Sequence, residues 1–152
     1  MESALECRRS ARLMIVSPGA RLLLFRYEDE HQAAFWATPG GELLVGESFV
    51  DAAQRELLEE TGFTTAVGKF LRERRATYAV ARSKPAQWLE RYYFVSVPEQ
   101  SSIPNCGWTE EERATIANWR WWSLPEMQQS DEIFKPIWIP HLFSDMLENL
   151  EA

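Results

Sequence analysis

The sequence has few cysteines and no long hydrophobic run, and each of these two features argues against a class of protein. Only two of its 152 residues are cysteines, Cys7 and Cys106, and they form neither a C-x-x-C pair nor a Cys/His cluster. A disulfide framework or a zinc site is therefore not expected. The N-terminal stretch has no apolar core of the signal-peptide kind, and no later run is long enough to cross a bilayer. We expect a soluble, cytoplasmic protein that does not bind membranes.

Basic residues are scarce relative to acidic ones. Lys and Arg together number 16 against 23 Asp and Glu, which gives a formal net charge of −7. Binding to duplex nucleic acid depends on clustered Lys and Arg that neutralise phosphates, so duplex nucleic acid is not an expected partner. If the ligand carries phosphate groups, something other than net charge must attract them.

The composition is that of a folded domain. Hydrophobic residues make up 45% of the chain, and both signs of charge are present. A chain of this length can bury a core without disulfides, and it contains no internal repeat or low-complexity linker. We expect residues 1–152 to form a single domain.

The hydrophobic pattern predicts strands interleaved with helices. Two short apolar runs, 11–17 and 21–27, are joined by the turn signal Ser-Pro-Gly-Ala and predict a hairpin. Pro140, followed by apolar residues at helical spacing, predicts a C-terminal amphipathic helix. Aromatic and β-branched residues predict three further strands, at 68–80, 87–97 and 118–122. The order of elements indicates an α/β domain with a mixed sheet.

The segment 49–61 carries the clearest helical pattern. Ser48 can cap its N-terminus, with Asp51 three residues later, and Gly62 supplies a C-terminal stop. Apolar residues recur at helical spacing and would fix one face of this helix against a sheet. We expect one helix over these residues.

Three acids stand together on this helix. Glu56, Glu59 and Glu60 occupy positions i, i+3 and i+4, so their carboxylates project from one face as near neighbours. On an exposed face such like charges cost only about 0.2–0.5 kcal/mol per pair, and an acidic solvated surface would explain them. In a cleft of effective dielectric near 20, carboxylates ~5 Å apart repel by about 3 kcal/mol per pair, which calls for a cation.

The ligand chemistry favours a hard ion. Oxygen ligands without Cys or His favour Mg²⁺, which takes one or two carboxylates and keeps positions open for water and substrate phosphates; Mn²⁺ is an alternative. A bound cation also inverts the local charge. An acidic protein could in this way hold a polyanion.

These acids belong to a longer motif. The stretch GELLVGESFVDAAQRELLEETGF, residues 41–63, matches the pattern G-x5-E-x7-R-E-U-x-E-E-x-G-U, with U apolar, at all nine specified positions. This pattern resembles the full Nudix box. Trp36 and Pro39-Gly40 extend the resemblance, although Thr38 stands where the family often has an apolar residue.

The resemblance implies a Nudix-type α/β/α sandwich and metal-dependent hydrolysis of a diphosphate linkage in a nucleoside diphosphate joined to a further group. It implies that Glu59 and Glu60 are metal ligands and that Glu56 is a further ligand or the general base. Arg55 would orient Glu56 and Glu59 and could pair with Glu47, unless that pair is only a stabilising ion pair. Gly41 would supply a backbone carbonyl to the metal or permit close approach of the substrate.

Outside the box the sequence offers weaker candidates. The family often adds a distal acidic ligand from a loop before a late strand, and Glu112 is favoured here, with Glu111 close behind; both could instead belong to a solvated helix start. Arg72 and Arg74 could reach a phosphate, and Trp36 could stack on a base, although a solvated strand face and core packing explain such residues equally simply.

Three functional readings follow. The first is a pyrophosphohydrolase acting on a small nucleotide such as a nucleoside triphosphate, nucleotide sugar or dinucleotide. The second is a catalytically idle Nudix-fold module that binds nucleotide, and the third is an acidic interaction surface without metal. Substrate specificity in this family lies in loops outside the box, so the sequence does not identify the substrate. The protein could be a monomer or a homodimer.

Overall fold

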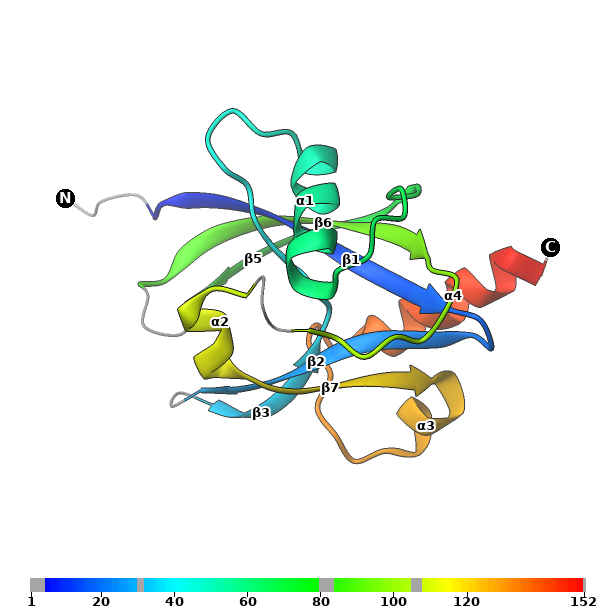
Figure 1. The fold of residues 1–152 in the computed structure, drawn as a ribbon. Coiled ribbons are helices and arrows are strands. Elements are labelled where there is room, and N and C mark those ends of the chain that lie inside the picture. The colour runs from blue at the N-terminus through cyan, green and yellow to red at the C-terminus, as the bar shows by residue number, and fades with distance from the viewer. Residues whose placement is uncertain (1–4, 30–31, 80–83, 105–107, 152) are drawn as a thin grey trace.

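The computed structural model describes residues 5–29, 32–79, 84–104 and 108–151, which form one mixed sheet and four helices (Figure 1). The strands run in the order β3-β2-β1-β6-β5, with β4 added to β1 and β7 added to β2. Their bounds are β1 Cys7–Ser17, β2 Arg21–Asp29, β3 Gln32–Ala37, β4 Gly40–Glu42, β5 Phe70–Tyr78, β6 Ala86–Ser96 and β7 Ile116–Ser123. The helices are α1 Phe49–Thr61, α2 Glu110–Thr115, α3 Leu124–Gln129 and α4 Ile139–Glu151.

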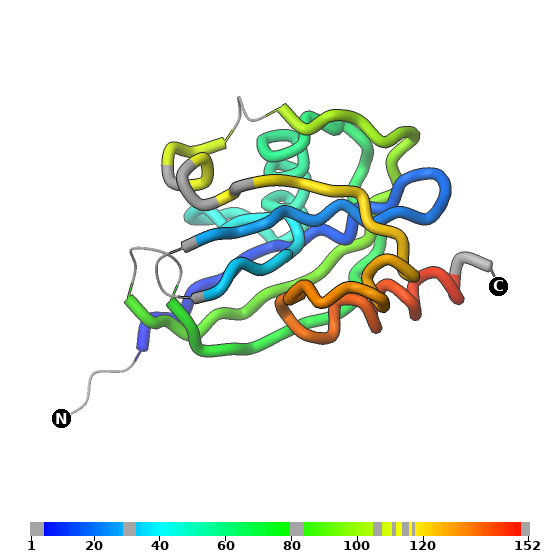
Figure 2. Tube along the Cα trace, turned by 90° about the horizontal axis from the view of Figure 1, so that it is seen from below, coloured from blue at the N-terminus to red at the C-terminus, as the bar shows by residue number. Residues whose placement is uncertain are grey.

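The sheet is mixed because β1 and β6 run parallel while the other paired strands run antiparallel. Helices α1 and α4 lie on opposite sides of it, as Figure 2 shows. This arrangement confirms the expected α/β architecture with a mixed sheet. In the described part of the chain, no helix combines the length and the apolar character needed to span a bilayer.

Two hydrophobic clusters hold the layers together. Along β1, Leu13 and Ile15 point to the cluster under α1, whereas Met14 and Val16 point to the cluster under α4. Successive strand residues face opposite sides of a sheet, so a nearly continuous apolar run serves a strand that is covered on both faces. The sheet is therefore the middle layer of the molecule.

Strand β1 changes partner along its length, and this change positions the site. Its C-terminal end pairs with β2 only at Val16↔Leu22 and Ser17↔Arg21. Its N-terminal half pairs with the short strand β4, where Ala11 lies opposite Gly41 and Arg12 opposite Gly40. The Gly40-Gly41 segment is thus held flat beside β1, just before the chain enters α1.

Most predicted elements are confirmed, with differences at the shortest ones. The hairpin, the helix 49–61, the later strands and the C-terminal helix are all present. The sequence pattern predicted two helices, whereas the described residues form four, because α2 and α3 have six residues each and carry little periodicity. Strand β4, at Gly40–Glu42, was not predicted, because three residues that include two glycines carry no strand pattern.

Candidate active site

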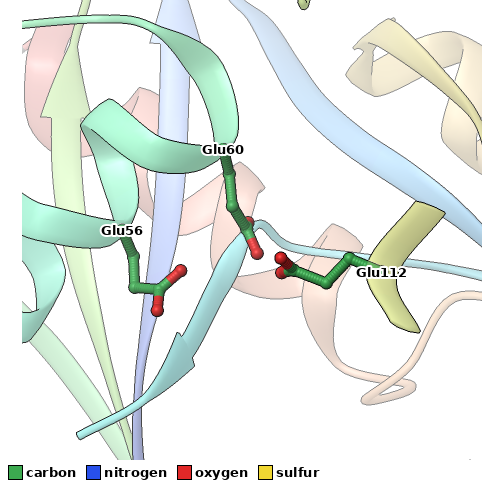
Figure 3. A group of neighbouring side chains, drawn as sticks. All are labelled: Glu56, Glu60 and Glu112. Carbon is green, nitrogen blue, oxygen red and sulfur yellow. The ribbon is translucent and has the colours of Figure 1, made fainter. Parts of the chain in front are cut away.

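Helix α1 is fixed at both ends by the residues expected to do so. The Ser48 hydroxyl accepts a hydrogen bond from the backbone N–H of Asp51 over 3.1 Å. At the other end the Gly62 N–H donates to the Leu58 carbonyl. Buried residues of the helix pack on the sheet, and Glu56 and Glu60 lie one turn apart on the side that faces β4 and α2 (Figure 3).

The two glycines of β4 allow these glutamates to approach the sheet. A Cβ on Gly41 would lie 2.4 Å from Oε1 of Glu56, so a larger residue would displace this carboxylate. Gly40 has φ of 145° and donates its N–H to Oε2 of Glu60 over 2.8 Å. Because Gly40 and Gly41 have no side chains, the carboxylates of Glu60 and Glu56 can lie directly against this segment.

Three carboxylates converge at this point. Oxygen atoms of Glu56, Glu60 and Glu112 lie within 4.8 Å of one another. Figure 3 shows the first two descending from α1 and Glu112 reaching toward them from α2. Glu56 and Glu60 are buried, and Glu112 is half-buried. The spacing and the donor atoms suit a hard divalent cation.

Local capping turns Glu112 toward the group. Its side chain accepts a hydrogen bond from the Thr109 N–H over 2.8 Å, and the Thr109 hydroxyl accepts one from the Glu112 N–H. This reciprocal pair is a capping box. Trp108 links the segment to α1 by donating its indole N–H to the Glu60 carbonyl over 2.8 Å. The side chain of Glu111, the alternative candidate, lies outside the described residues.

Burial and mutual repulsion perturb the titration of these acids. Burial raises the pKa of Glu56 to about 7, against the lowering effect of Arg55. Burial, the hydrogen bond with Glu112 and the charge of Glu56 raise the pKa of Glu60 well above its usual value. Burial would also raise the pKa of Glu112, but hydrogen bonds with Glu60 and Thr109 outweigh it and lower that pKa. Without a cation, Glu60 therefore binds its proton more tightly than an exposed glutamate does.

The carboxylate oxygens of this group fit a metal ion. Oε1 of Glu60 is buried and receives no hydrogen bond from a donor group in the described part of the chain. Buried carboxylate oxygens normally have a partner, so a shared proton or a cation must compensate this one. The three carboxylates could hold a metal ion, and they supply the oxygen ligands that Mg²⁺ and Mn²⁺ prefer.

Arg55 occupies the centre of a second set of contacts beside this group. Its guanidinium donates to both oxygens of Glu47, at 2.8 and 2.9 Å, and to the Glu42 carbonyl at 3.0 Å. It also donates to Glu56 at 2.8 Å and to Glu59 at 2.9 Å. The hydrogen bond from Arg55 lowers the pKa of Glu47 to about 2. The expected contacts of Arg55 with Glu47, Glu56 and Glu59 are therefore present.

The three glutamates of α1 separate into two environments. Relative to Glu56, at 100° per residue, Glu60 lies roughly 40° to one side of the helix and Glu59 roughly 60° to the other. Glu60 points to the carboxylate group, whereas the side chain of Glu59 is 45% exposed and contacts Arg55. Glu59 is not part of the three-carboxylate group in this structure.

The predicted substrate contacts lie on the sheet face that packs on α4. Trp36 is 4% exposed and meets Trp122 edge-on at 5.2 Å. The Arg72 guanidinium lies 3.9 Å above the Trp138 ring, and Arg74 donates to Glu90 over 2.7 Å. A substrate role for these residues stays a prediction, and for Trp36 it would require the ring to leave its core packing.

Two supporting residues, Trp108 and Thr109, did not come from the sequence analysis. Thr109 and Glu112 match the spacing of a capping box, a local signal that favours Glu112 over its neighbours as the residue held by the helix start. No local signal marks Trp108, because its hydrogen bond joins it to a residue 48 positions away.

A three-layer fold (Figure 2) whose acidic helix brings carboxylates together beside a glycine strand defines an α/β protein with a candidate metal site. Comparison with known families specifies it: the model of the NUDIX domain matches residues 7–142. The chain therefore belongs to the NUDIX domain family.

Individual proteins show the same relationship. The crystal structure of a MutT protein from Methanosarcina mazei Go1 is 17% identical, with a TM-score of 0.70 over 99% of this chain and 100% of that one. The Escherichia coli dihydroneopterin triphosphate pyrophosphohydrolase is 17% identical, with a TM-score of 0.68 over 93% and 95%. At such identities the likeness concerns the fold.

A curated relative is much longer than this chain. A Myxococcus xanthus protein described as an octanoyltransferase is 37% identical over 87 residues, which make up 57% of this chain and 24% of that protein. The matched region is thus about a quarter of the relative, and its name describes the longer protein.

Proposed function

We propose that this protein hydrolyses a diphosphate linkage in a nucleoside diphosphate derivative and that it requires Mg²⁺, with Mn²⁺ as a substitute. The observation that carries the proposal is the convergence of Glu56, Glu60 and Glu112 within 4.8 Å beside the Gly40-Gly41 segment. Three acids so close, one of them with an unpartnered buried oxygen, repel one another when ionised, and a cation would balance them.

The three carboxylates would hold the cation, with the Gly41 carbonyl as a further oxygen ligand. The bound cation would neutralise charge on the phosphate oxygens and lower the pKa of a bound water. Glu56 is a further ligand or, alternatively, the general base that accepts the proton of the attacking water. Hydrolysis adds water across the P–O–P linkage, and each product leaves with its own phosphate end.

Arg55 and Glu47 would act as positioning residues. Arg55 holds Glu56 at 2.8 Å, and Glu47 holds Arg55 through both of its oxygens. Glu59, a ligand by the resemblance to the Nudix box, would join the cation only if its side chain turned away from Arg55. Positioning of this kind matters because a ligand displaced by about 1 Å can cost roughly 100-fold in rate.

A small nucleotide is the proposed partner, and Arg72, Arg74 and Trp36 are proposed as its contacts outside the box. The exposed free thiol of Cys7 suits a reducing compartment, which supports a cytoplasmic location. The comparison with a triphosphate pyrophosphohydrolase supports including pterin and nucleoside triphosphates among the substrates to be tested. Whether the protein is a monomer or a homodimer stays open to measurement.

The proposal is tested by phosphate release from a panel of nucleoside triphosphates, nucleotide sugars and dinucleotides, with added pyrophosphatase and with Mg²⁺, Mn²⁺ or EDTA. We expect turnover of one class that needs metal, disappears in Glu60→Gln and persists in Asp51→Asn. Asp51 is a matched control because it is an exposed acid on the same helix.

The same proteins distinguish the other readings. Stabilisation by nucleotide without any release of phosphate or mononucleotide would favour an idle binding module. No stabilisation by Mg²⁺ or Mn²⁺, together with no turnover, would favour an acidic surface without a metal.

A further inference from the structure

A second group of buried charges lies next to the carboxylates, and Arg74 is its one member already proposed as a substrate contact. Glu90 of β6 is 2% exposed and receives hydrogen bonds from two arginines on neighbouring strands. Arg12 of β1 donates from Nε over 3.2 Å, and Arg74 of β5 donates from Nη1 over 2.7 Å. The group formed by one carboxylate and two guanidinium ions therefore has one more positive than negative charge.

This group is rich in donors and has no free acceptor. Glu90 Oε2 also accepts hydrogen bonds from the hydroxyls of Ser10, at 3.4 Å, and Tyr78, at 3.0 Å, so both of its oxygens are occupied. Arg74 uses one N–H for Glu90, and within the described residues its remaining N–H groups have no hydrogen-bond acceptor. A ligand here would meet donors and positive charge, which favours an anionic group with several acceptor oxygens.

Both arginines can be reached from solvent. The side chain of Arg12 is 18% exposed and that of Arg74 is 29% exposed, although the carboxylate that joins them is buried. Arg12 also donates from Nη1 to the Thr38 carbonyl over 3.4 Å, so Arg74, the more exposed of the two, has more N–H groups available for a ligand.

The strands hold the group rigidly. Across the sheet, Glu90 lies opposite Ser10 on one side and opposite Arg74 on the other. The Arg74 guanidinium lies over the Tyr78 ring, and Tyr78 stacks on Trp88 with ring centres 5.5 Å apart. A site built on strands and supported by packed rings needs little reorganisation to bind.

The glycine strand joins this group to the candidate metal site. A Cβ on Gly40 would lie 3.0 Å from Cδ of Arg12, so the arginine side chain passes directly over this glycine. The N–H of the same glycine bonds to Glu60, and the next residue, Gly41, lies against Glu56. Arg12 and the two carboxylates of α1, Glu56 and Glu60, thus lie against the same two-glycine segment.

We propose that Arg12 and Arg74, held in place by Glu90, form an anion site that binds an acidic group of the substrate beyond the two phosphates that are cleaved apart. This inference rests on the proposed function, because it takes the bound molecule to be the substrate. It assigns the substrate to derivatives with at least one additional phosphate or carboxylate group. Glu90 is a positioning residue, and the two arginines make the contacts.

The first test uses inorganic phosphate as the probe, in EDTA, so that it is independent of metal and of turnover. Phosphate should raise the Tm of the wild-type protein by about 3–5 °C at roughly ten times its Kd, relative to chloride at equal ionic strength. The shift should disappear in Arg74→Gln and in Arg12→Gln. The shift should persist in Arg21→Gln. This variant is a matched control because Arg21, the first residue of β2, also pairs with a glutamate, Glu126.

Folding of the variants is checked by their Tm without phosphate. If Arg12→Gln unfolds, Arg74→Gln and Arg12→Lys carry the test, because the first changes the more exposed arginine and the second keeps the charge. Arg12→Lys should retain a reduced shift. The proposal is overturned if phosphate fails to stabilise the wild-type protein, or if all variants, Arg21→Gln included, respond alike, as expected when the group only stabilises the sheet.

The second test separates the acidic groups of the substrate. With a substrate that carries the extra group, Arg74→Gln should raise KM about tenfold and leave kcat nearly unchanged. With an analogue that lacks this group, the same variant should behave as wild type. Equal effects on both substrates would contradict the assignment. Phosphate binding without any turnover would support the anion site while sinking the proposed hydrolase, so the two failures are distinguishable.

Discussion

Trp108 donates its indole N–H to the main-chain carbonyl of Glu60 over 2.8 Å, and this bond connects the segment that carries Glu112 to the helix that carries the other two carboxylates. The Trp108 ring also packs on Phe25 with centroids 5.4 Å apart. The tryptophan therefore fixes the distance between the two parts of the candidate metal site.

Replacement of Trp108 by Phe should keep most of the packing and remove the hydrogen bond. The Glu60 carbonyl would lose its side-chain partner, and the free energy of unfolding should fall by about 1–3 kcal/mol. Because Glu112 would be less firmly placed, the Kd for Mn²⁺ should rise as well. Urea denaturation and calorimetric titration measure the two effects, and a loss of stability without any change in Kd would show that the tryptophan serves packing alone.

Gly41→Ala should reduce activity without unfolding the protein. The added Cβ would lie 2.4 Å from a Glu56 oxygen, so this carboxylate must move. A shift of about 1 Å in such a group costs roughly 100-fold in kcat/KM. Steady-state kinetics with the best substrate measure this effect.

The control for this variant is Gly19→Ala in the turn between β1 and β2. Its added Cβ meets open space, although φ is 80°, so we expect a loss of about 1–2 kcal/mol in stability and unchanged kinetics. Full activity in Gly41→Ala would contradict the placement of Glu56 against this glycine.

The parts of the structure that follow from local signals could be predicted, and those that depend on pairing between distant strands could not. Helix α1 is specified by Ser48, Gly62 and a regular apolar spacing, all within a few residues of one another. The acidic pattern identified Glu56 and Glu60, because the i, i+4 spacing places them together on any helix.

Other features required the fold itself. The contact of Arg12 with Glu90 joins residues 78 positions apart and depends on the parallel register of β1 and β6, which no local pattern encodes. Trp36 was predicted as a substrate contact because its ring could stack on a base. Its burial against Trp122 arises from the pairing of β3 and β7 with β2 and from the cluster under α4.

Glu112 and Glu110 form a matched pair for testing the distal ligand. Both lie in α2, but Glu112 belongs to the carboxylate group, whereas Glu110 is exposed. Gln is accepted at the third position of a capping box, so Glu112→Gln should keep the helix start intact. We expect it to raise the Kd for Mn²⁺ by at least about tenfold, and Glu110→Gln to leave the Kd unchanged. Equal affinities in the two variants would remove Glu112 from the proposed ligands.

The raised pKa of Glu56 predicts how stability depends on pH when no metal is bound. Its usual value is 4.5, and burial raises it to about 7 in the folded state, so the folded protein binds the proton more tightly than the unfolded chain does. Stability from this group is complete below about pH 4.5 and is lost as pH rises through 7, by on the order of 3 kcal/mol. Glu60, whose pKa is also raised, acts in the same direction.

Thermal or urea unfolding in EDTA between pH 4.5 and 8 measures this dependence. Glu56→Gln cannot ionise, so its stability should fall less over the same range, and the two curves should diverge as pH rises. Saturating Mg²⁺ should flatten the wild-type curve, because a cation stabilises the ionised carboxylates that the buried site otherwise disfavours. A wild-type protein that becomes steadily more stable toward pH 8 in EDTA would contradict both the burial of these acids and their role as metal ligands.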